Sequence, residues 1–252
     1  MCDGLGWVPG QPRMHPLGYE CQTMRRCPAC AEARTKVRLA RRTARISQEC
    51  GLSGPQRAKR FENFETYAVD GRGNHDALRW SREFAANPGQ TWLVMPGLPG
   101  TGKTHLLAAI GNELAARGIP VLYAYVPKLL NWLRDGYRHQ QASLWGDVGG
   151  EDEDFQRRFR RVMEVEVLLL DDLGAQQDTP WVREQLETIF DHRYSNQLPL
   201  AVTTNDDPSR IRDLSERVYS RIMRYESTAR VPLLAPPYHE RARTPDGRGS
   251  RG

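Results

Sequence analysis

Two kinds of apolar pattern alternate along the middle of the chain. Short apolar runs, each the length of a strand, lie at 91–95, 120–125, 165–170 and 200–203. Between them, apolar side chains recur every three or four residues, which predicts helices over 74–84, 103–116, 127–140, 181–194 and 208–224. Strands that alternate with helices of this length predict an α/β domain built on a parallel sheet. The run at 165–170 is almost wholly apolar, as expected of a strand covered on both faces.

Outside this region the pattern weakens. The 252 residues are 39% hydrophobic, which is low, so some segments need no large core. We divide the chain into a Cys-rich module (1–33), a basic linker helix (34–60), the α/β domain (61–236) and a Pro-, Arg- and Gly-rich disordered tail (237–252). No apolar run reaches the roughly 18 residues of a membrane span, and the N-terminus lacks the order of a secretory signal. We therefore expect a cytoplasmic protein with no membrane contact.

The positive charge is concentrated near the N-terminus. The whole chain carries +5, whereas its first sixty residues hold twelve Lys and Arg against four Asp and Glu. Much of the excess winds around the predicted linker helix, at Arg34, Lys36, Arg38, Arg41, Arg42 and Arg45. This helix is either a solvated linker or a contact to an acidic protein surface or to nucleic acid.

Four of the five cysteines fall in the first thirty residues. Cys27 and Cys30 form a C-x-x-C turn, which is the spacing of half a tetrahedral zinc site. Cys21 and either Cys2 or His15 would complete the site. A segment with so few apolar residues cannot form a sufficient core and needs a cross-link such as a bound metal, so we predict structural Zn²⁺. The alternatives are unpaired thiols on a flexible arm or a redox pair.

The turn after the strand at 91–95 carries the clearest chemistry. It reads GLPGTGKT, fits the G-x-x-x-x-G-K-[ST] pattern and lies between a predicted strand and a predicted helix. Glycines let successive backbone N–H groups face phosphates, and the helix N-terminus adds its dipole. Lys103 should reach the β- and γ-phosphates, and the Thr104 hydroxyl should bind Mg²⁺. The residues expected to contact the nucleotide are Gly97, Leu98, Pro99, Gly100, Thr101, Gly102, Lys103, Thr104 and His105.

Two further strands end in polar residues. The run at 165–170 delivers Asp171 and Asp172 to the carboxyl edge of the sheet, where ligands bind in such folds. Asp171 should hold Mg²⁺ and Asp172 should orient the attacking water. ATPases of this plan mostly carry Glu at the second position, so an Asp predicts slow hydrolysis. Asn205 follows the strand at 200–203 and either contacts the γ-phosphate or water, or caps the next helix.

Arginines on the last predicted helix are candidates for a finger that reaches a neighbouring subunit's γ-phosphate. Arg217, Arg221 and Arg224 are the candidates, and position alone does not choose among them. The alternative is surface ion pairing, for instance between Arg217 and Asp213.

Taken together, these motifs resemble the DnaC/IstB-type AAA+ ATPases, and most of all the replicative helicase loaders of the DnaC/DnaI kind. The resemblance covers about 61–224 and rests on RFENF, GLPGTGKTHLLAAIGNEL, VLYAYVPKLLNWLR, VLLLDDLG, LAVTTN and ERVYSRI. It implies an AAA+ P-loop αβα sandwich with the helical lid mostly absent. It favours Arg221 as the finger, with Arg217 second.

The resemblance also implies a function. The N-terminal module would grip the replicative DNA helicase, and the ATPase would bind ATP and Mg²⁺, assemble with other copies and bind single-stranded DNA. ATP binding would drive assembly, and a slow, DNA- or partner-stimulated hydrolysis would release the loader. Two alternatives stay open: an IstB-like transposition accessory ATPase, and an ATP-gated assembly switch with little turnover.

Overall fold

The computed structural model describes residues 7–18, 20–69, 72–143, 155–205, 208–224 and 226–238. The chain divides into two compact units, Met1–Arg45 and Ile46–Gly252. No helix in the described ranges is both long enough and apolar enough to span a bilayer. The acidic sequence GGEDED at 149–154 and residues 239–252 of the predicted tail lie outside the described residues.

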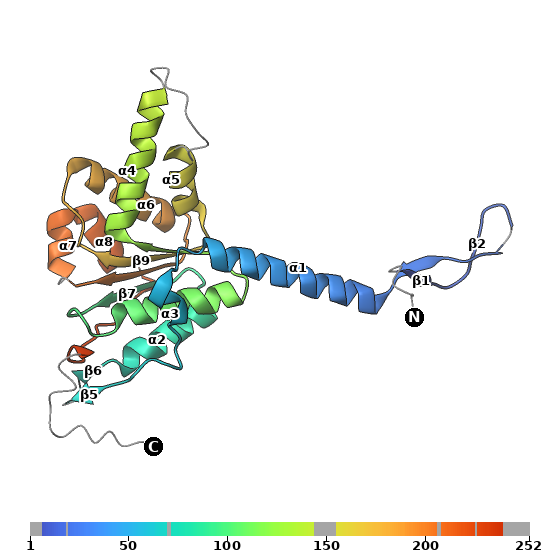
Figure 1. Ribbon diagram of the computed structural model, residues 1–252, viewed down its shortest axis with the longest axis horizontal. Helices are drawn as coiled ribbons and strands as arrows, with labels where there is room; N and C mark the ends of the chain where they lie inside the picture. Colours follow the sequence, from blue (N-terminus) through green and yellow to red (C-terminus); the bar gives the residue numbers. More distant parts are fainter. Residues whose placement is uncertain are drawn as a thin grey trace. The chain divides into compact units, whose positions relative to one another are not determined.

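The first unit is a small β-ribbon followed by a helix. In the ribbon, β1 (Trp7–Pro9) pairs antiparallel with β4 (Met24–Arg26), and β2 (Arg13–Met14) pairs with β3 (Glu20–Cys21). The helix α1 (Pro28–Glu49) begins in this unit (Figure 1). Proline suits a first helical position, because the N–H that it lacks would have no partner there. Pro28 and Cys30 therefore lie in the first turn of α1, so the predicted C-x-x-C turn is helical from Pro28 onward.

The second unit is built on a five-stranded parallel sheet of order β11-β7-β10-β9-β8. The prediction of a parallel α/β fold is confirmed. Four of the strands were expected from their apolar runs, and β11 was not. The strands are β7 (Trp92–Pro96), β8 (Val121–Tyr125), β9 (Val167–Leu173), β10 (Leu200–Thr204) and β11 (Thr228–Arg230).

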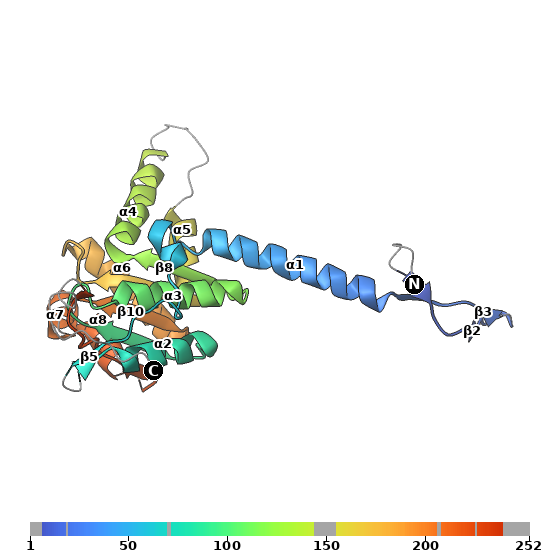
Figure 2. The same cartoon turned by 60° about the horizontal axis from the view of Figure 1, so that its bottom comes forward.

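Successive residues of each central strand enter two different cores. In β7, Leu93 and Met95 pack into one apolar cluster, whereas Trp92 and Val94 pack into the other. All four are almost fully buried, which explains why the run shows no polar alternation. The sheet is thus the middle layer of an αβα sandwich (Figures 1 and 2).

The helices divide between the two faces of this sheet. One cluster contains residues of α2 (His75–Ala86) and α3 (Lys103–Ala116). The other contains residues of five helices, namely α4 (Val126–Ser143), α5 (Phe155–Glu164), α6 (Pro180–Ser195), α7 (Pro208–Leu214) and α8 (Glu216–Arg224). The predicted and observed bounds of α3 agree, whereas α5 was not predicted.

The single helix predicted at 208–224 is two helices, because Ser215 interrupts it. Its hydroxyl accepts a hydrogen bond from the Val218 N–H at 3.2 Å and donates one to Glu187 at 2.7 Å. A serine oxygen that accepts from the third residue of a helix is an N-cap. Ser215 thereby begins α8 as a separate helix, the one that carries the candidate finger arginines.

Segments before and after the predicted core complete the second unit. Cys50 and Leu52, assigned above to the linker, are buried in the core, and the Tyr123 N–H donates to the Cys50 carbonyl at 2.7 Å. A short 3-10 helix (Gly54–Ala58) and the hairpin of β5 (Ala68–Val69) and β6 (Arg72–Gly73) then lead to α2. The linker therefore does not extend to residue 60 as an exposed helix.

The described residues after β11 continue along β7. The Val231 and Leu233 N–H groups donate to the Val94 and Pro96 carbonyls, each at 2.8 Å. The Tyr238 N–H then donates to the Gly100 carbonyl at 2.9 Å, so this residue of the predicted tail lies against the glycine-rich turn. Where a helical lid would follow, the chain from 228 to 237 forms β11 and extended backbone.

Candidate functional site

The glycine-rich turn joins β7 to α3 at the carboxyl edge of the sheet. Its glycines are needed at two points, since Gly100 and Gly102 have φ angles of 79° and 109°. A Cβ on Gly102 would lie 2.7 Å from the ring of Phe64, closer than real side chains approach. The turn therefore has the left-handed backbone of a phosphate-binding loop, and Gly102 also leaves room for the Phe64 ring.

Lys103 occupies the centre of this loop. Its ammonium donates to the carbonyls of Gly97 and Leu98, both at 2.7 Å, and the residue is buried. Burial lowers the pKa of Lys103, and the nearby charges of Asp172 and Asp171 oppose that shift. The ammonium is thus held where it can exchange two carbonyl oxygens for phosphate oxygens.

Asp171 is the most heavily hydrogen-bonded group of the site. One carboxylate oxygen accepts from the Thr203 hydroxyl at 2.6 Å and from the Thr104 hydroxyl at 3.1 Å. The other accepts from the Tyr123 hydroxyl at 2.6 Å. Burial is the main cause that raises the pKa of Tyr123 far above its usual value, so this phenol remains a donor. Sequence reasoning missed Tyr123 and Thr203, which look like ordinary strand residues.

The Thr104–Asp171 pair fits a magnesium ion. A hydroxyl and a carboxylate oxygen 3.1 Å apart are hard oxygen donors, which Mg²⁺ prefers. Asp171 is 4% exposed, and its carboxylate is oriented by hydroxyls from two other strands.

Asp172 and Asn205 meet at the same edge of the sheet. The Asn205 amide donates to the Asp172 carboxylate, and the Asp172 N–H donates to the Thr203 hydroxyl at 2.9 Å. Asp172 has a φ of 63°, a left-handed conformation that is uncommon for a residue other than glycine. The register of β9 against β10 shifts beside it, between Val202 and Thr204. The polar residues of these two neighbouring strands are therefore brought together.

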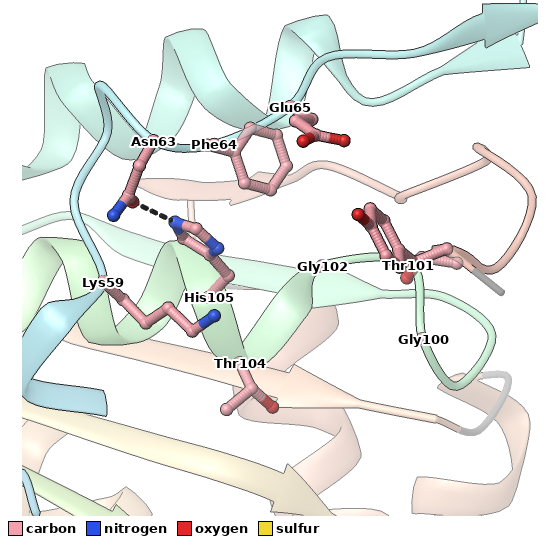
Figure 3. A pocket seen from close by; sticks show the side chains of 10 residues that line it. Lys59, Asn63, Phe64, Glu65, Gly100, Thr101, Gly102, Thr104 and His105 are labelled. Atoms are coloured by element: carbon pink, nitrogen blue, oxygen red, sulfur yellow. Dashed lines mark hydrogen bonds between the residues drawn. The ribbon is translucent and has the colours of Figure 1, made fainter. Parts of the chain in front are cut away.

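A cavity of about 390 Å³ opens beside the loop (Figure 3). The loop residues and His105 form one wall, while the segment before α2 and the segment after β11 supply side chains that were not predicted. The latter are Lys59, Asn63, Phe64, Glu65 and Tyr238. The RFENF motif contains two of them, but the sequence does not show that they face the loop.

His105 and Phe64 form the apolar part of this cavity. Their rings meet edge to face with centroids 5.2 Å apart, and His105 Nε2 lies 2.9 Å from the Arg60 carbonyl and 3.0 Å from the Asn63 side-chain oxygen. Burial lowers the pKa of His105, Lys59 lowers it further, and the Arg60 carbonyl opposes both. A neutral imidazole beside an aromatic ring suits a flat heterocycle such as a nucleobase.

Two of the candidate finger arginines, Arg217 and Arg221, are paired within the chain. Arg221 Nε lies 2.8 Å from an Asp191 carboxylate oxygen, and its guanidinium lies 4.0 Å from the centre of the Tyr194 ring. Arg217 contacts Asp191 at 3.3 Å and Glu187 at 3.8 Å. Both arginines therefore bind α6, and Arg217 pairs with Asp191 and Glu187 rather than with Asp213, the partner considered above.

The expected zinc ligands are not gathered by the structure. Among the described residues, no group of three or more His, Cys, Asp and Glu is placed to hold a metal. The Cys21 thiol donates to the Arg13 carbonyl at 3.1 Å, and Cys27 is buried before α1. His15 Nδ1 accepts from the Leu17 N–H at 3.3 Å, while Cys2 lies outside the described residues. The described thiols therefore do not support the zinc prediction.

Comparison with known proteins agrees with this geometry. The family described as the bacterial DnaA ATPase domain matches residues 56–226. The replicative helicase loader DnaI of Bacillus subtilis is 30% identical over 66% of the chain, and the loader DnaC of Escherichia coli K12 is 30% identical over 64%. These matches span 45% and 62% of the relatives' own lengths. A crystal structure of the DnaC helicase loader superposes with a TM-score of 0.54 and 25% identity, covering 72% of this chain and 99% of that one.

Proposed function

Because the chain belongs to the bacterial DnaA ATPase-domain family, we propose that it is an ATP-dependent loader of the replicative DNA helicase. It binds the helicase and helps place it on single-stranded DNA, while ATP binding and hydrolysis control assembly and release. The observation that carries the proposal is the joining of Lys103, Thr104 and Asp171 at one sheet edge, in a chain whose relatives are helicase loaders. These relatives favour the loader over an IstB-like transposition accessory ATPase.

The chain's own residues supply the parts of a phosphoryl-transfer site. The loop N–H groups and the Lys103 ammonium bind the phosphates, and Phe64 and His105 receive the base. Thr104 and Asp171 would hold Mg²⁺, which when bound supplies positive charge to the phosphate oxygens. Asp172 orients the attacking water, and Asn205 keeps its carboxylate in place.

Slow basal turnover follows from the same arrangement. Asp172 is one methylene shorter than the usual Glu, and Asn205 already occupies part of its hydrogen-bonding capacity. DNA or a partner would accelerate turnover by moving this pair or by supplying a finger. A comparison of turnover with and without single-stranded DNA tests this point.

Arg221 is the proposed finger, and it acts on the ATP bound by a neighbouring copy. To do so it must exchange Asp191 for a phosphate oxygen. Arg217→Ala is the matched control, because it removes the same charge from the same helix and the same acidic partner. Arg221→Ala should lower DNA-stimulated turnover at least tenfold more than Arg217→Ala does. Equal near-zero rates for wild type and Arg221→Ala, with and without DNA, would favour the assembly switch.

Co-purification tests the loader function itself. The full chain is mixed with the host's replicative helicase, with an ATP analogue and without nucleotide. The wild type should form a complex, and Lys103→Ala should lose nucleotide binding while Lys128→Ala, another lysine exchange in the same unit, keeps it. If no complex forms in either condition, the loader hypothesis is refuted. Assembly on duplex DNA without helicase would favour the transposition alternative.

Elemental analysis of the purified full chain decides the zinc prediction separately. About one zinc per chain is expected of a metal-stapled module. A folded N-terminal module without metal would refute it, in agreement with the described thiols.

A further inference from the structure

The arginines of α1 lie on one face of that helix. Arg34, Arg38, Arg41, Arg42 and Arg45 follow the i, i+4, i+7, i+8 and i+11 spacing. At 3.6 residues per turn, these positions fall within an arc of about 100°. All five are exposed and belong to the first compact unit. We call these five residues the arginine stripe. The sequence alone suggested basic residues all around the helix, whereas these five share one face.

At Arg34, Arg38, Arg41 and Arg42 the stripe lacks the acidic residues that usually accompany basic residues on a solvated helix, whereas Arg45 has Glu49 one turn away. No Asp or Glu occurs between residues 33 and 48. Within the part of the chain that the structure describes, no ion pair involves Arg34, Arg38, Arg41 or Arg42. Three pairs of arginines stand four residues apart, and each such like-charge pair destabilises a helix by about 0.2–0.5 kcal/mol. A simple linker would gain stability from glutamates here, so the uncompensated charge points to an anionic ligand.

We propose that the arginine stripe is a nucleic-acid-binding surface that contacts the phosphate backbone, outside the ATPase unit. Eleven residues of helix extend about 16 Å at about 1.5 Å per residue, and one DNA strand places a phosphate about every 3.4 Å along the duplex axis. The stripe therefore spans about five phosphates. Guanidinium groups bind phosphate oxygens through two parallel N–H donors.

An acidic protein surface is a poorer match than a polynucleotide. Protein interfaces depend on large apolar or aromatic anchors at their centre. Between residues 34 and 45, the positions that fall within this arc are the five arginines alone, so no large apolar or aromatic side chain stands among them. A row of positive charges without an apolar side chain at its centre suits a ligand that carries a row of negative charges, such as a phosphate backbone. The inference adds a second DNA contact to the loader and does not depend on the ATPase mechanism.

The test compares two full-length variants that lose the same four positive charges. One neutralises the stripe (R34Q/R38Q/R41Q/R42Q). The control neutralises four exposed arginines that pair with surface carboxylates (R79Q/R82Q/R160Q/R183Q). Binding of labelled single-stranded and duplex oligonucleotides is measured by fluorescence anisotropy over a range of salt concentrations, without nucleotide. The two oligonucleotides show which form of DNA supplies the phosphates.

The stripe variant should lose about 3 units of the slope of log K against log salt concentration with single-stranded DNA, and about 4 with duplex. The control should keep the wild-type slope. An unchanged slope in the stripe variant, or an equal loss in both variants, would overturn the proposal. Loss of helicase capture with DNA binding intact would instead assign the stripe to an acidic protein surface. Binding of an ATP analogue reports separately on the ATPase unit, so failure of the loader function is distinguishable.

Discussion

The hydroxyl of Tyr123 offers the sharpest test of how the magnesium ligand is held. Tyr123→Phe keeps the ring, which is 6% exposed in the core beside β9, and removes only the hydroxyl. That hydroxyl donates to the Asp171 carboxylate at 2.6 Å. The variant therefore leaves one oxygen of a buried carboxylate with a donor fewer and changes little else.

The size of the effect follows from the kind of bond that is lost. A hydrogen bond to a charged group contributes about 1.5–3 kcal/mol, and each 1.4 kcal/mol is about tenfold in an equilibrium constant. Loss of groups that orient a metal ligand typically lowers metal affinity by about 10–100-fold. The two arguments agree, so the Mg²⁺ concentration for half-maximal ATPase activity should rise about 10–100-fold in Tyr123→Phe.

The assay is a magnesium titration of ATP turnover, with binding of a fluorescent ATP analogue in the absence of metal as a second readout. Analogue binding should change less than about threefold, because the phosphate loop is intact. Tyr125→Phe is the matched control, since it removes a hydroxyl from the same strand and the residue is 36% exposed. A half-saturating Mg²⁺ concentration within twofold of the wild type, or an equal rise in the control, would refute a positioning role for Tyr123.

Three further predictions concern other parts of the second unit. Gly102→Ala should weaken ATP binding more than tenfold, because the residue has a left-handed backbone and its new Cβ would clash with Phe64. Gly89→Ala is the control, because Gly89 also has a positive φ but no close contact, and it should leave ATP binding unchanged. Arg193→Met should lower the free energy of unfolding by more than about 3 kcal/mol, since its buried guanidinium donates to carbonyls of two segments, 165–166 and Pro199. A loss of under about 1 kcal/mol in a urea titration would contradict this. Burial lowers the pKa of His105, so the unfolded chain binds its proton more readily. The free energy of unfolding should then fall as the pH drops below about 6.5. Urea titrations at several pH values would contradict this if the free energy of unfolding had the same pH dependence in wild type and in His105→Asn.

Local patterns allowed the phosphate loop to be predicted from the sequence. Glycine spacing, a preceding apolar strand and a following amphipathic helix are all set within about thirty residues, so the bounds of α3 and the place of Lys103 follow without tertiary information. Asp171 was predictable for the same reason, because it ends an apolar run. Its two strongest donors were not, since Tyr123 and Thr203 come from neighbouring strands 48 and 32 residues away.

Elements defined mainly by long-range pairing escaped prediction. β11 contains Thr228, Ala229 and Arg230, which have no strand pattern of their own, and it exists because it pairs with β7. The cavity wall likewise joins Phe64, from before α2, with Tyr238, from beyond β11. A single sequence shows that such residues exist but not that they meet. The break at Ser215 was local and was missed, because a helical period continues across the cap.

Arginine identity carries little information in this chain, and its surroundings carry much. The chain uses arginine for nearly all its basic residues, so the choice of Arg over Lys at any one position is not a functional signal. The two terminal nitrogens of Arg193 donate to backbone carbonyls, so this arginine holds the fold together. Arg221 is satisfied by one carboxylate and one ring, a pairing that a phosphate could replace. Arg34 and Arg38, on the arginine stripe, have no acidic partner in the described residues. The partner that each guanidinium has or lacks, rather than the net charge of +5, therefore distinguishes a structural arginine from one that we propose acts on ATP or DNA.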